Sequence, residues 1–424
     1  MSYLVVFLFV YAVFELAEIW LKYLNYQYVS CQDRQKSCQK VLGISEDNLQ
    51  KSYAYFKDHY YFSLLKKSLY LVCFILFYAL GGLTLFEQIA LSLSSYVNGA
   101  EMVTGIIFFA FTAVVTTILG LPLDYYATFV LEQKHGFNKY TTRLFCTDIL
   151  KSTVISLVLS SVFYGLFMFL ISMGGFWWLT TWILASLFLF LSCLIQPLIN
   201  HWFYKFAPID RDGDDQALYD GLVDMAKRVN FQLSKILKIN GSKRSTHGNA
   251  YFTGFFKQKR VVLYDTLMEK LNHDELLAVV AHELGHYKLG HLKFRVMQAT
   301  AVSFVVFAGL SLIAARPELA QDFGFSGATL YTTTFFFFLF FNKIIVRFLQ
   351  PLFSFLSRHD EFAADRFAAS LSPAKDLVAG LLKLREMNQT MPLTHPLVSW
   401  LYASHPPVIE RITVLESIGD EGKA

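Results

Sequence analysis

Long apolar stretches alternating with polar segments dominate the pattern of this chain. Seven stretches are long enough to cross the hydrocarbon core of a bilayer, which takes about 20 helical residues. They cover residues 3–21, 66–86, 102–121, 152–172, 177–199, 294–314 and 329–355. The pattern therefore predicts a mainly α-helical membrane protein with seven transmembrane helices.

The positions of Lys and Arg predict how these helices are oriented. Basic residues are frequent in the segments 22–65, 122–151, 200–293 and in the part after residue 355. The alternate segments, 87–101, 173–176 and 315–328, contain a single basic residue, Arg316. Because basic loops stay in the cytoplasm, we expect the N-terminus outside and the C-terminus inside.

The same spans divide the chain into four parts. We expect a five-helix membrane block with cytoplasmic loops (1–199), a cytoplasmic insert (200–293), a transmembrane hairpin of helices six and seven (294–355) and a cytoplasmic C-terminal part (356–424). Short β-prone runs at 235–239, 250–253 and 260–264 predict strands in the insert. The insert is therefore expected to be an α+β domain.

Composition narrows the class of protein further. Hydrophobic residues make up 54% of the chain and charged residues only 17%. The net charge of +4 is small, and no tract combines basic and aromatic residues as nucleic-acid readers do. We therefore expect no nucleic-acid partner. The five cysteines are scattered without metal-ligand spacing, so they are not expected to hold a metal.

The run His-Glu-Leu-Gly-His at residues 282–286 is the strongest indication of chemistry. Two histidines four positions apart lie on one face of a helix, so His282 and His286 can bind one metal ion. Glu283 can take a proton from a bound water without being a ligand.

The residues before this run predict the helix that carries it. Asn272 and Glu275 have the spacing of a capping box, which predicts a helix start. The apolar run 276–281 that follows is too short to span a bilayer. We therefore expect the motif on a buried helix of a water-facing domain.

A catalytic zinc ion usually keeps three protein ligands and one water, so a third ligand is needed. A three-histidine site would require Gly at position 289 and His at position 292, where this chain has Leu289 and Leu292. The stretch that continues the seventh span offers Glu361 and Asp365, one helical turn apart. We predict that Glu361 completes a site for one Zn²⁺ per chain and that Asp365 orients a metal histidine.

In these motifs the chain resembles the integral-membrane CAAX prenyl proteases, which are zinc endopeptidases of the thermolysin-like (gluzincin) group. The stretches that carry the resemblance are Glu132 to Asn138, Ser242 to Ser245, Gly248 to Phe252, His282 to His286, Glu361 to Asp365, Ser404 to Pro407, and Glu410 with Arg411. The resemblance implies a barrel of seven membrane helices around a water-filled chamber. It also implies a thermolysin-like α+β zinc protease domain on the cytoplasmic side.

The resemblance further implies an activity and more site residues. The activity is cleavage of the C-terminal tripeptide from prenylated CAAX proteins by zinc-activated water. By position, Asn249 and Ala250 lie on an edge strand that pairs with the substrate. His405 or Arg411 stabilises the oxyanion, unless these two residues serve in helix capping or in an ion pair with Asp365 or Glu410. The expected partners are a lipidated or extended peptide and the lipid bilayer.

Two alternatives stay open at this point. One is a quality-control membrane protease that acts on unlipidated polypeptides. The other is a transporter or channel with structural zinc, which would need a fourth protein ligand. The compact length and the run 246–249 are similar to bacterial members, which favours a bacterial inner membrane over the endoplasmic reticulum. His359, Asp360 and Ala363 depart from the family's usual residues.

Overall fold

The computed structural model describes the chain except for residues 1, 210–212, 214, 254–258, 315 and 422–424. The described part is mainly helical, with one small sheet. The first elements are α1 (Tyr3–Val29), α2 (Gln32–Leu42), α3 (Glu46–Ala79), α4 (Gly82–Ser95), α5 (Glu101–Tyr126), the π-helical turn η1 (Ala127–Glu132), α6 (Thr142–Ser172) and α7 (Trp177–Phe203).

The following segment holds the strands and the helix with the histidine motif. Its elements are β1 (Phe206–Pro208), α8 (Gln216–Arg228), β2 (Leu233–Ile239), the short 3₁₀ turn η2 (Gly241–Lys243), β3 (Ala250–Thr253), β4 (Lys259–Tyr264), α9 (Asp265–Met268) and α10 (His273–Lys288). The rest is α11 (His291–Ser311), α12 (Pro317–Asp322), α13 (Leu330–Phe340), η3 (Phe341–Ile345), α14 (Val346–Ala369), α15 (Ala374–Met387), α16 (Pro396–Tyr402) and α17 (Val408–Glu421).

Six helices of the described residues are long and apolar enough to cross a membrane. They run over Tyr3–Val29, Glu46–Ala79, Glu101–Glu132, Thr142–Ser172, His291–Ser311 and Leu330–Ala369. Each contains most or all of one predicted span. The seventh predicted span, 177–199, lies within α7, whose apolar part among the described residues, Trp177–Ser192, is shorter than the six spans. Six spans are therefore confirmed, and the seventh stays a prediction.

The predicted second span, 66–86, was wrong at its C-terminal end. Helix α3 ends at Ala79, and Gly81 then adopts a left-handed conformation with φ of +75° before α4 begins. A non-glycine residue is strained there, so the glycine permits a sharp turn inside an apolar run. Hydropathy alone does not register such a turn, because the residues on both sides are apolar.

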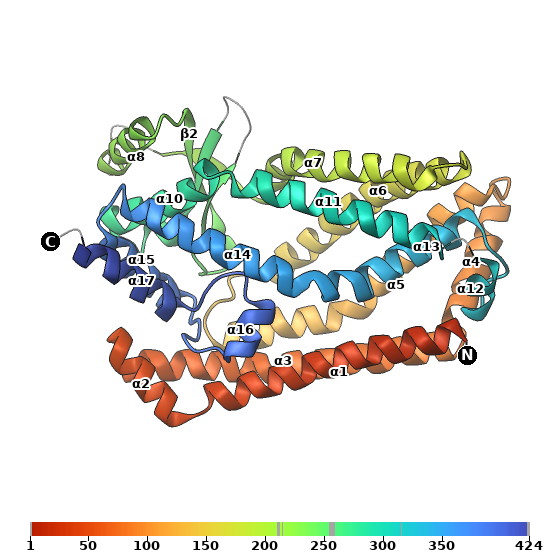
Figure 1. Ribbon diagram of the computed structural model, residues 1–424, viewed down its shortest axis with the longest axis horizontal. Coiled ribbons are helices and arrows are strands. Elements are labelled where there is room, and N and C mark those ends of the chain that lie inside the picture. The colour runs from red at the N-terminus through yellow and green to blue at the C-terminus, as the bar shows by residue number, and fades with distance from the viewer. Residues whose placement is uncertain (1, 210–212, 214, 254–258, 315, 422–424) are drawn as a thin grey trace.

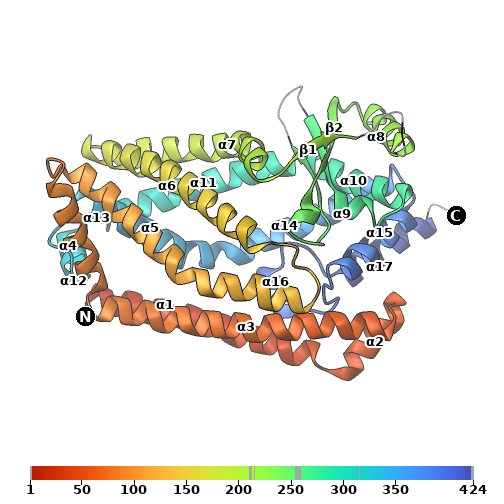
Figure 2. The same ribbon diagram turned by 180° about the vertical axis from the view of Figure 1, so that it is seen from behind.

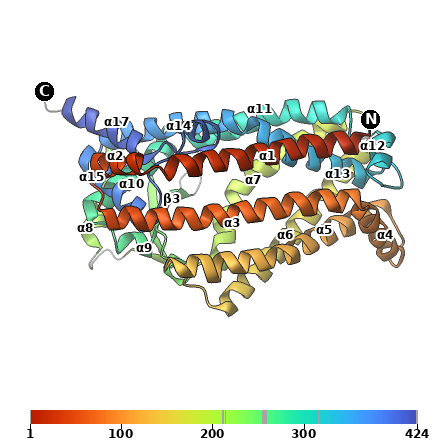
Figure 3. The same ribbon diagram turned by 90° about the horizontal axis from the view of Figure 1, so that it is seen from below.

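The long helices run side by side along the longest axis of the molecule (Figure 1). The sheet, α8, α10, α15 and α17 gather at one end, and the N-terminus, α4 and α12 lie at the other. The view from behind shows α5 and α6 on the face opposite to α14 (Figure 2). The view from below shows α1 and α3 extending along most of the length (Figure 3).

The two largest hydrophobic cores lie at these two ends. At the N-terminal end, aromatic residues of several helices pack closely, with Phe7, Phe108 and Phe336 almost fully buried. A second core lies between α8, the sheet, α10 and α15. In each candidate span, only 6–22% of the residues in its most apolar stretch are buried. Most of each long helix therefore faces lipid or the interior of the bundle; the predicted chamber itself stays a prediction.

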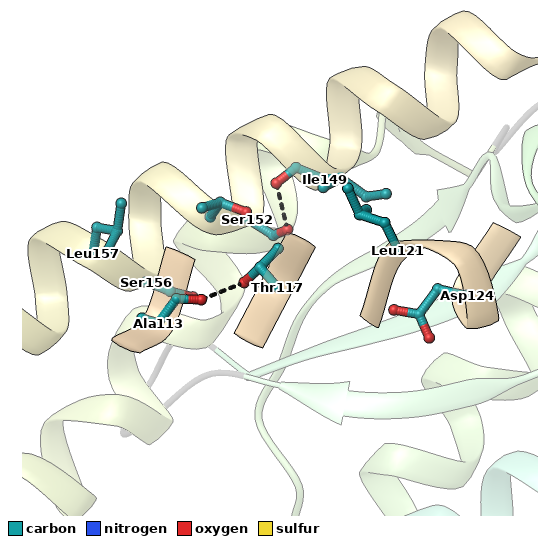
Figure 4. Close-up of a pocket in the computed structure, with 9 residues that line it drawn as sticks. Ala113, Thr117, Leu121, Asp124, Ile149, Ser152, Ser156 and Leu157 are labelled. Carbon is teal, nitrogen blue, oxygen red and sulfur yellow. Dashed lines mark hydrogen bonds between the residues drawn. The ribbon is translucent and has the colours of Figure 1, made fainter. Parts of the chain in front are cut away.

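A cavity of about 200 Å³ lies between α5 and α6 (Figure 4). Its lining includes Thr117, Asp124, Ser152, Thr153 and Ser156. Polar groups are costly against lipid within a membrane, so this lining favours a position toward the inside of the bundle. The cavity shares no residue with the histidine motif.

The sheet has the strand order β1-β2-β4-β3. Strand β4 pairs in parallel with β2 and antiparallel with β3, and β1 pairs antiparallel with β2. The three predicted strands are confirmed. Strand β1 was missed because it is only three residues long and contains Pro208. Strand β3 forms one edge of the sheet among the described residues.

Candidate metal centre

Helix α10 begins with the predicted capping box. The Glu275 backbone N–H donates to Asn272 Oδ1 at 2.9 Å, and the Asn272 N–H donates to Glu275 Oε2 at 2.9 Å. These bonds satisfy two amides that a helix start leaves unpaired. Residues 278–281 are buried in the second core, so the helix is anchored just before the histidine motif.

Helix α10 packs directly against α14 through small residues. A Cβ atom on Gly285 would lie 3.1 Å from Ala364 Cα and 3.2 Å from the Ala364 carbonyl oxygen. Ala364 is fully buried at this crossing. The glycine of the motif therefore permits the close backbone approach that brings α14 opposite the two histidines.

We expect Gly285→Ala to weaken metal binding by forcing α10 and α14 apart. The added methyl group meets backbone atoms of Ala364, which cannot rotate away, and such overpacking costs about 1–3 kcal/mol of stability. Thermal unfolding and zinc titration of the purified variant measure both effects. Gly309→Ala is the control, because a Cβ there meets nothing within 4 Å. Equal zinc affinity in the wild type and in Gly285→Ala would contradict this interpretation.

The close crossing brings three potential ligands together. His286 Nε2 lies 3.2 Å from Glu361 Oε1, and His282 Nε2 lies 3.5 Å from Glu361 Oε2. The two Nε2 atoms are 3.2 Å apart. All three ligand atoms lie within 4.8 Å of one another, and no other such group was found in the part of the chain that the structure describes. The structure thus unites the three residues that the sequence predicted as ligands.

The chemistry of these donors fits a metal ion. His282 Nδ1 lies 2.9 Å from Asp365 Oδ1, so its proton is on Nδ1 and its Nε2 presents a lone pair. Glu361 Oε2 is buried and lacks a hydrogen bond of acceptable geometry. Two imidazole nitrogens and a carboxylate then point acceptor atoms at one another, an arrangement that a bound cation stabilises.

Asp365 is fully buried between His282 and Arg411. Arg411 donates from Nε to Asp365 Oδ2 at 2.8 Å and from Nη2 to Oδ1 at 2.6 Å. Burial by itself lowers the pKa of His282, but the nearby carboxylates of Asp365 and Glu361 outweigh it and raise that pKa. These two hydrogen bonds from Arg411 keep the buried Asp365 carboxylate charged. The carboxylate in turn fixes the orientation of the His282 ring.

Glu283 is the free carboxylate of the site. It is half-buried and has no hydrogen bond or ion pair with any residue that the structure describes. Burial raises the pKa of the Glu283 carboxyl, and the positive charges of His282 and His286 partly oppose this rise. A carboxylate with a raised pKa holds a proton more readily than an ordinary one, which suits a group that accepts and returns a proton.

His405, in the loop between α16 and α17, contacts the carboxylate of the predicted ligand Glu361. Its Nδ1 lies 2.8 Å from Glu361 Oε2, and 66% of its side chain is exposed. Arg411 Nη1 lies 3.6 Å from the same oxygen, but Arg411 is buried and already paired with Asp365. Both residues that the sequence assigned to the oxyanion are therefore at the site, in different environments.

Asn249 and Ala250 lie at the edge strand rather than in the ligand cluster. The Asn249 carbonyl accepts a hydrogen bond from Tyr264 N at 3.1 Å, so Asn249 faces β4. Opposed residues of antiparallel strands alternate between bonded and non-bonded pairs, so the Ala250 peptide groups point to the free edge. The Ala250 N–H is bonded to Asn249 Oδ1 at 2.8 Å. Strand β3 itself lies against α10.

Two residues beside the ligands were missed by sequence reasoning. His291 Nδ1 lies 2.9 Å from His286 Nδ1, and Asp360 Oδ1 lies 3.7 Å from His291 Nε2. His291 stands five positions after His286, a spacing that no regular helix places on one face. The only signal in the sequence was Gly290, which permits the turn between the two histidines.

The fold and the site together define a class of protein, the multi-pass membrane metalloendopeptidases. The chain belongs to peptidase family M48, whose family model matches residues 214–419. A second model, described as the CAAX prenyl protease N-terminal region with five membrane helices, matches residues 27–205. These matches confirm the resemblance that the motifs indicated.

Individual relatives agree over most of the chain. It is 35% identical over 393 residues to a CAAX prenyl protease 1 homolog of Arabidopsis thaliana, covering 88% of each chain. It is 34% identical over 365 residues to a CAAX prenyl protease 1 homolog of Homo sapiens, covering 75% of this chain and 74% of that one. A crystal structure of S. mikatae Ste24p superposes with a TM-score of 0.87 at 28% identity, covering 96% of this chain and 99% of the other.

Proposed function

We propose that this protein is a zinc endopeptidase that removes the C-terminal tripeptide from prenylated CAAX proteins or peptides. The observation that carries the proposal is the convergence of His282, His286 and Glu361 beside Glu283. The names of the relatives support the choice of substrate class. A structural site would be closed by a fourth protein ligand, and the described residues offer only three, which argues against a transporter with structural zinc.

We propose one Zn²⁺ per chain, held by His282, His286 and Glu361. Two imidazoles and one carboxylate are a donor set that suits catalytic zinc. When bound, zinc lowers the pKa of water and polarises the substrate carbonyl. Asp365 holds the proton of His282 at Nδ1, and Arg411 in turn holds Asp365.

In this proposal Glu283 accepts the proton of the attacking water and returns it to the leaving amine. His405 stabilises the oxyanion, because its side chain is exposed at the site and, among the described residues, its ion-pair partner is Glu361. Arg411 is assigned to positioning, because its Nε and Nη2 are both bonded to Asp365. Of the two residues that the sequence left open for the oxyanion, the proposal therefore takes His405.

Strand β3 is the proposed substrate-pairing edge. The Ala250 N–H and carbonyl point to the free side of the sheet, where an extended peptide adds as a further strand. A substrate carbonyl would take the place of the Asn249 side-chain oxygen on the Ala250 N–H. Main-chain hydrogen bonds do not depend on the side chains of the peptide. This edge alone therefore does not discriminate between lipidated and unlipidated peptides.

The orientation and the division of the chain are also proposals. The excess of Lys and Arg supports placing the sheet and the metal centre on the cytoplasmic side. We retain the four parts 1–199, 200–293, 294–355 and 356–424, and we propose a bacterial inner membrane. In this arrangement α11 carries the chain from the site into the membrane, and α14 carries it out of the membrane back into the site.

We expect the detergent-purified protein to cleave a farnesylated CAAX peptide with a kcat/KM at least about 100-fold above that of its unlipidated twin. Each buried CH₂ group contributes about 0.8 kcal/mol to lipid binding, so an isoprenoid supplies ample discrimination. Removal of metal with a chelator should abolish both activities, and added zinc should restore them. Equal kcat/KM values for the two peptides would instead favour quality-control proteolysis of unlipidated polypeptides.

A further inference from the structure

The two metal histidines differ in what holds their second ring nitrogen. His282 Nδ1 faces the buried carboxylate of Asp365 at 2.9 Å. Within the described part of the chain, His286 Nδ1 faces no carboxylate; its neighbour is another imidazole nitrogen, Nδ1 of His291, at 2.9 Å. One proposed metal ligand, His282, is therefore supported by a carboxylate, and the other, His286, by a second histidine.

The contact between His286 and His291 has only one arrangement compatible with metal binding. Two nitrogens 2.9 Å apart share one proton, so one donates and the other accepts. His286 must present the Nε2 lone pair to the metal, and its proton is then on Nδ1. His291 accepts this proton at Nδ1, and its own proton is on Nε2.

The surroundings of His291 favour this tautomer. Its Nε2 points toward Asp360 Oδ1 at 3.7 Å, where a negative charge attracts the N–H. Asp360 is itself held by Arg295, which donates from Nε to Oδ2 at 3.0 Å. Arg295 Nη2 also donates to Ser357 Oγ at 3.1 Å. Side chains of His291 and Asp360 are only 12% and 11% exposed, so water competes little for these contacts.

The backbone places His291 in this position. Gly290 has φ of +76°, which ends α10 and starts α11. The turn returns His291, the first residue of α11, to the last turn of α10. Arg295 follows one helical turn later on α11, and Ser357 and Asp360 lie on α14 beside Glu361. The contacts thus join the ligand helix α10 to both membrane helices that enter the site.

We propose that His291, supported by Asp360 and Arg295, is a positioning residue that fixes the ring and the tautomer of the metal ligand His286. The proposal rests on the proposed metal site. A positioning role predicts an effect on metal affinity and on the geometry of the bound metal, whereas a purely structural role predicts an effect on the stability of the metal-free protein.

The test is zinc titration of the metal-stripped, full-length protein in detergent. We expect His291→Leu, which removes the acceptor, to weaken zinc binding about 10- to 100-fold. His291→Gln, whose amide oxygen can accept from His286, should recover most of this affinity. Asp360→Asn, which keeps the shape but removes the charge, should give a smaller loss. His273→Leu is the matched control, because His273 is an exposed histidine at the first position of α10.

Two further measurements separate positioning from folding. The visible spectrum of the Co²⁺-substituted protein should change in His291→Leu and stay unchanged in His273→Leu. Thermal unfolding of the metal-free variants should match that of the wild type. The inference is overturned if His291→Leu binds zinc like the wild type, or if its loss follows apo-protein stability and His291→Gln does not restore it. If the wild type itself binds no zinc, the proposed function fails first.

Discussion

Replacement of Glu283 by Gln is expected to abolish peptide cleavage while one zinc ion per chain stays bound. The amide has nearly the shape of the carboxylate but cannot accept a proton from water. General acid–base catalysis contributes about 10²–10⁴-fold to a rate, and we expect a loss of kcat near the upper end of this range. The measurement is the turnover of a fluorogenic farnesylated peptide, with the zinc content of the same sample determined by elemental analysis.

The control for this variant is Glu269→Gln, which makes the same chemical change at an exposed position after α9. It should retain wild-type turnover and wild-type zinc content. Normal turnover in Glu283→Gln would rule out the role of general base. Loss of zinc together with activity would move Glu283 from proton transfer to metal binding.

Replacement of Glu361 by Gln should give the complementary result, in which zinc is lost together with activity. Glu361 supplies the only carboxylate of the three ligands, and its Oε2 is buried without a well-formed hydrogen bond. A neutral amide is a much weaker zinc ligand than a carboxylate. We expect zinc affinity to fall by more than about 100-fold, which exceeds the loss expected when a residue that only supports a ligand is replaced. Competition titration with a chromogenic zinc chelator measures this affinity.

His359→Gln is the matched control for Glu361→Gln, because His359 is exposed two positions earlier on α14. It should bind zinc and cleave peptide like the wild type. Retention of tight zinc binding by Glu361→Gln would mean that another residue completes the site. The two predictions together assign separate roles, since one variant keeps the metal and the other loses it.

Prediction from the sequence was most successful where the residues that act together lie on one helix. His282 and His286 share a face because four residues make about one turn, and Asn272 with Glu275 marks the helix start for the same reason. Glu361 and Asp365 repeat this spacing on α14. Pairing the two helices needed one further step, the elimination of other third ligands, and the structure brings these residues together.

Prediction was least successful where the chain turns. The break at Gly81 lies inside an apolar run, and the turn at Gly290 places His291 against His286 despite a spacing of five. Asp360 was noted only as a departure from the family. Each of these features depends on backbone dihedral angles or on the crossing of helices, which residue type specifies weakly.

The sequence by itself determined the membrane class, six of the spans, the metal-binding motif and the family, because each depends on hydropathy or on spacing within one element. Only the tertiary structure decided which outer partner supports each histidine, and that Arg411 is paired with Asp365 while His405 is exposed. These side-chain contacts join residues from different helices. They depend on the close approach of α10 and α14 at Gly285, where a few tenths of an ångström separate contact from clash.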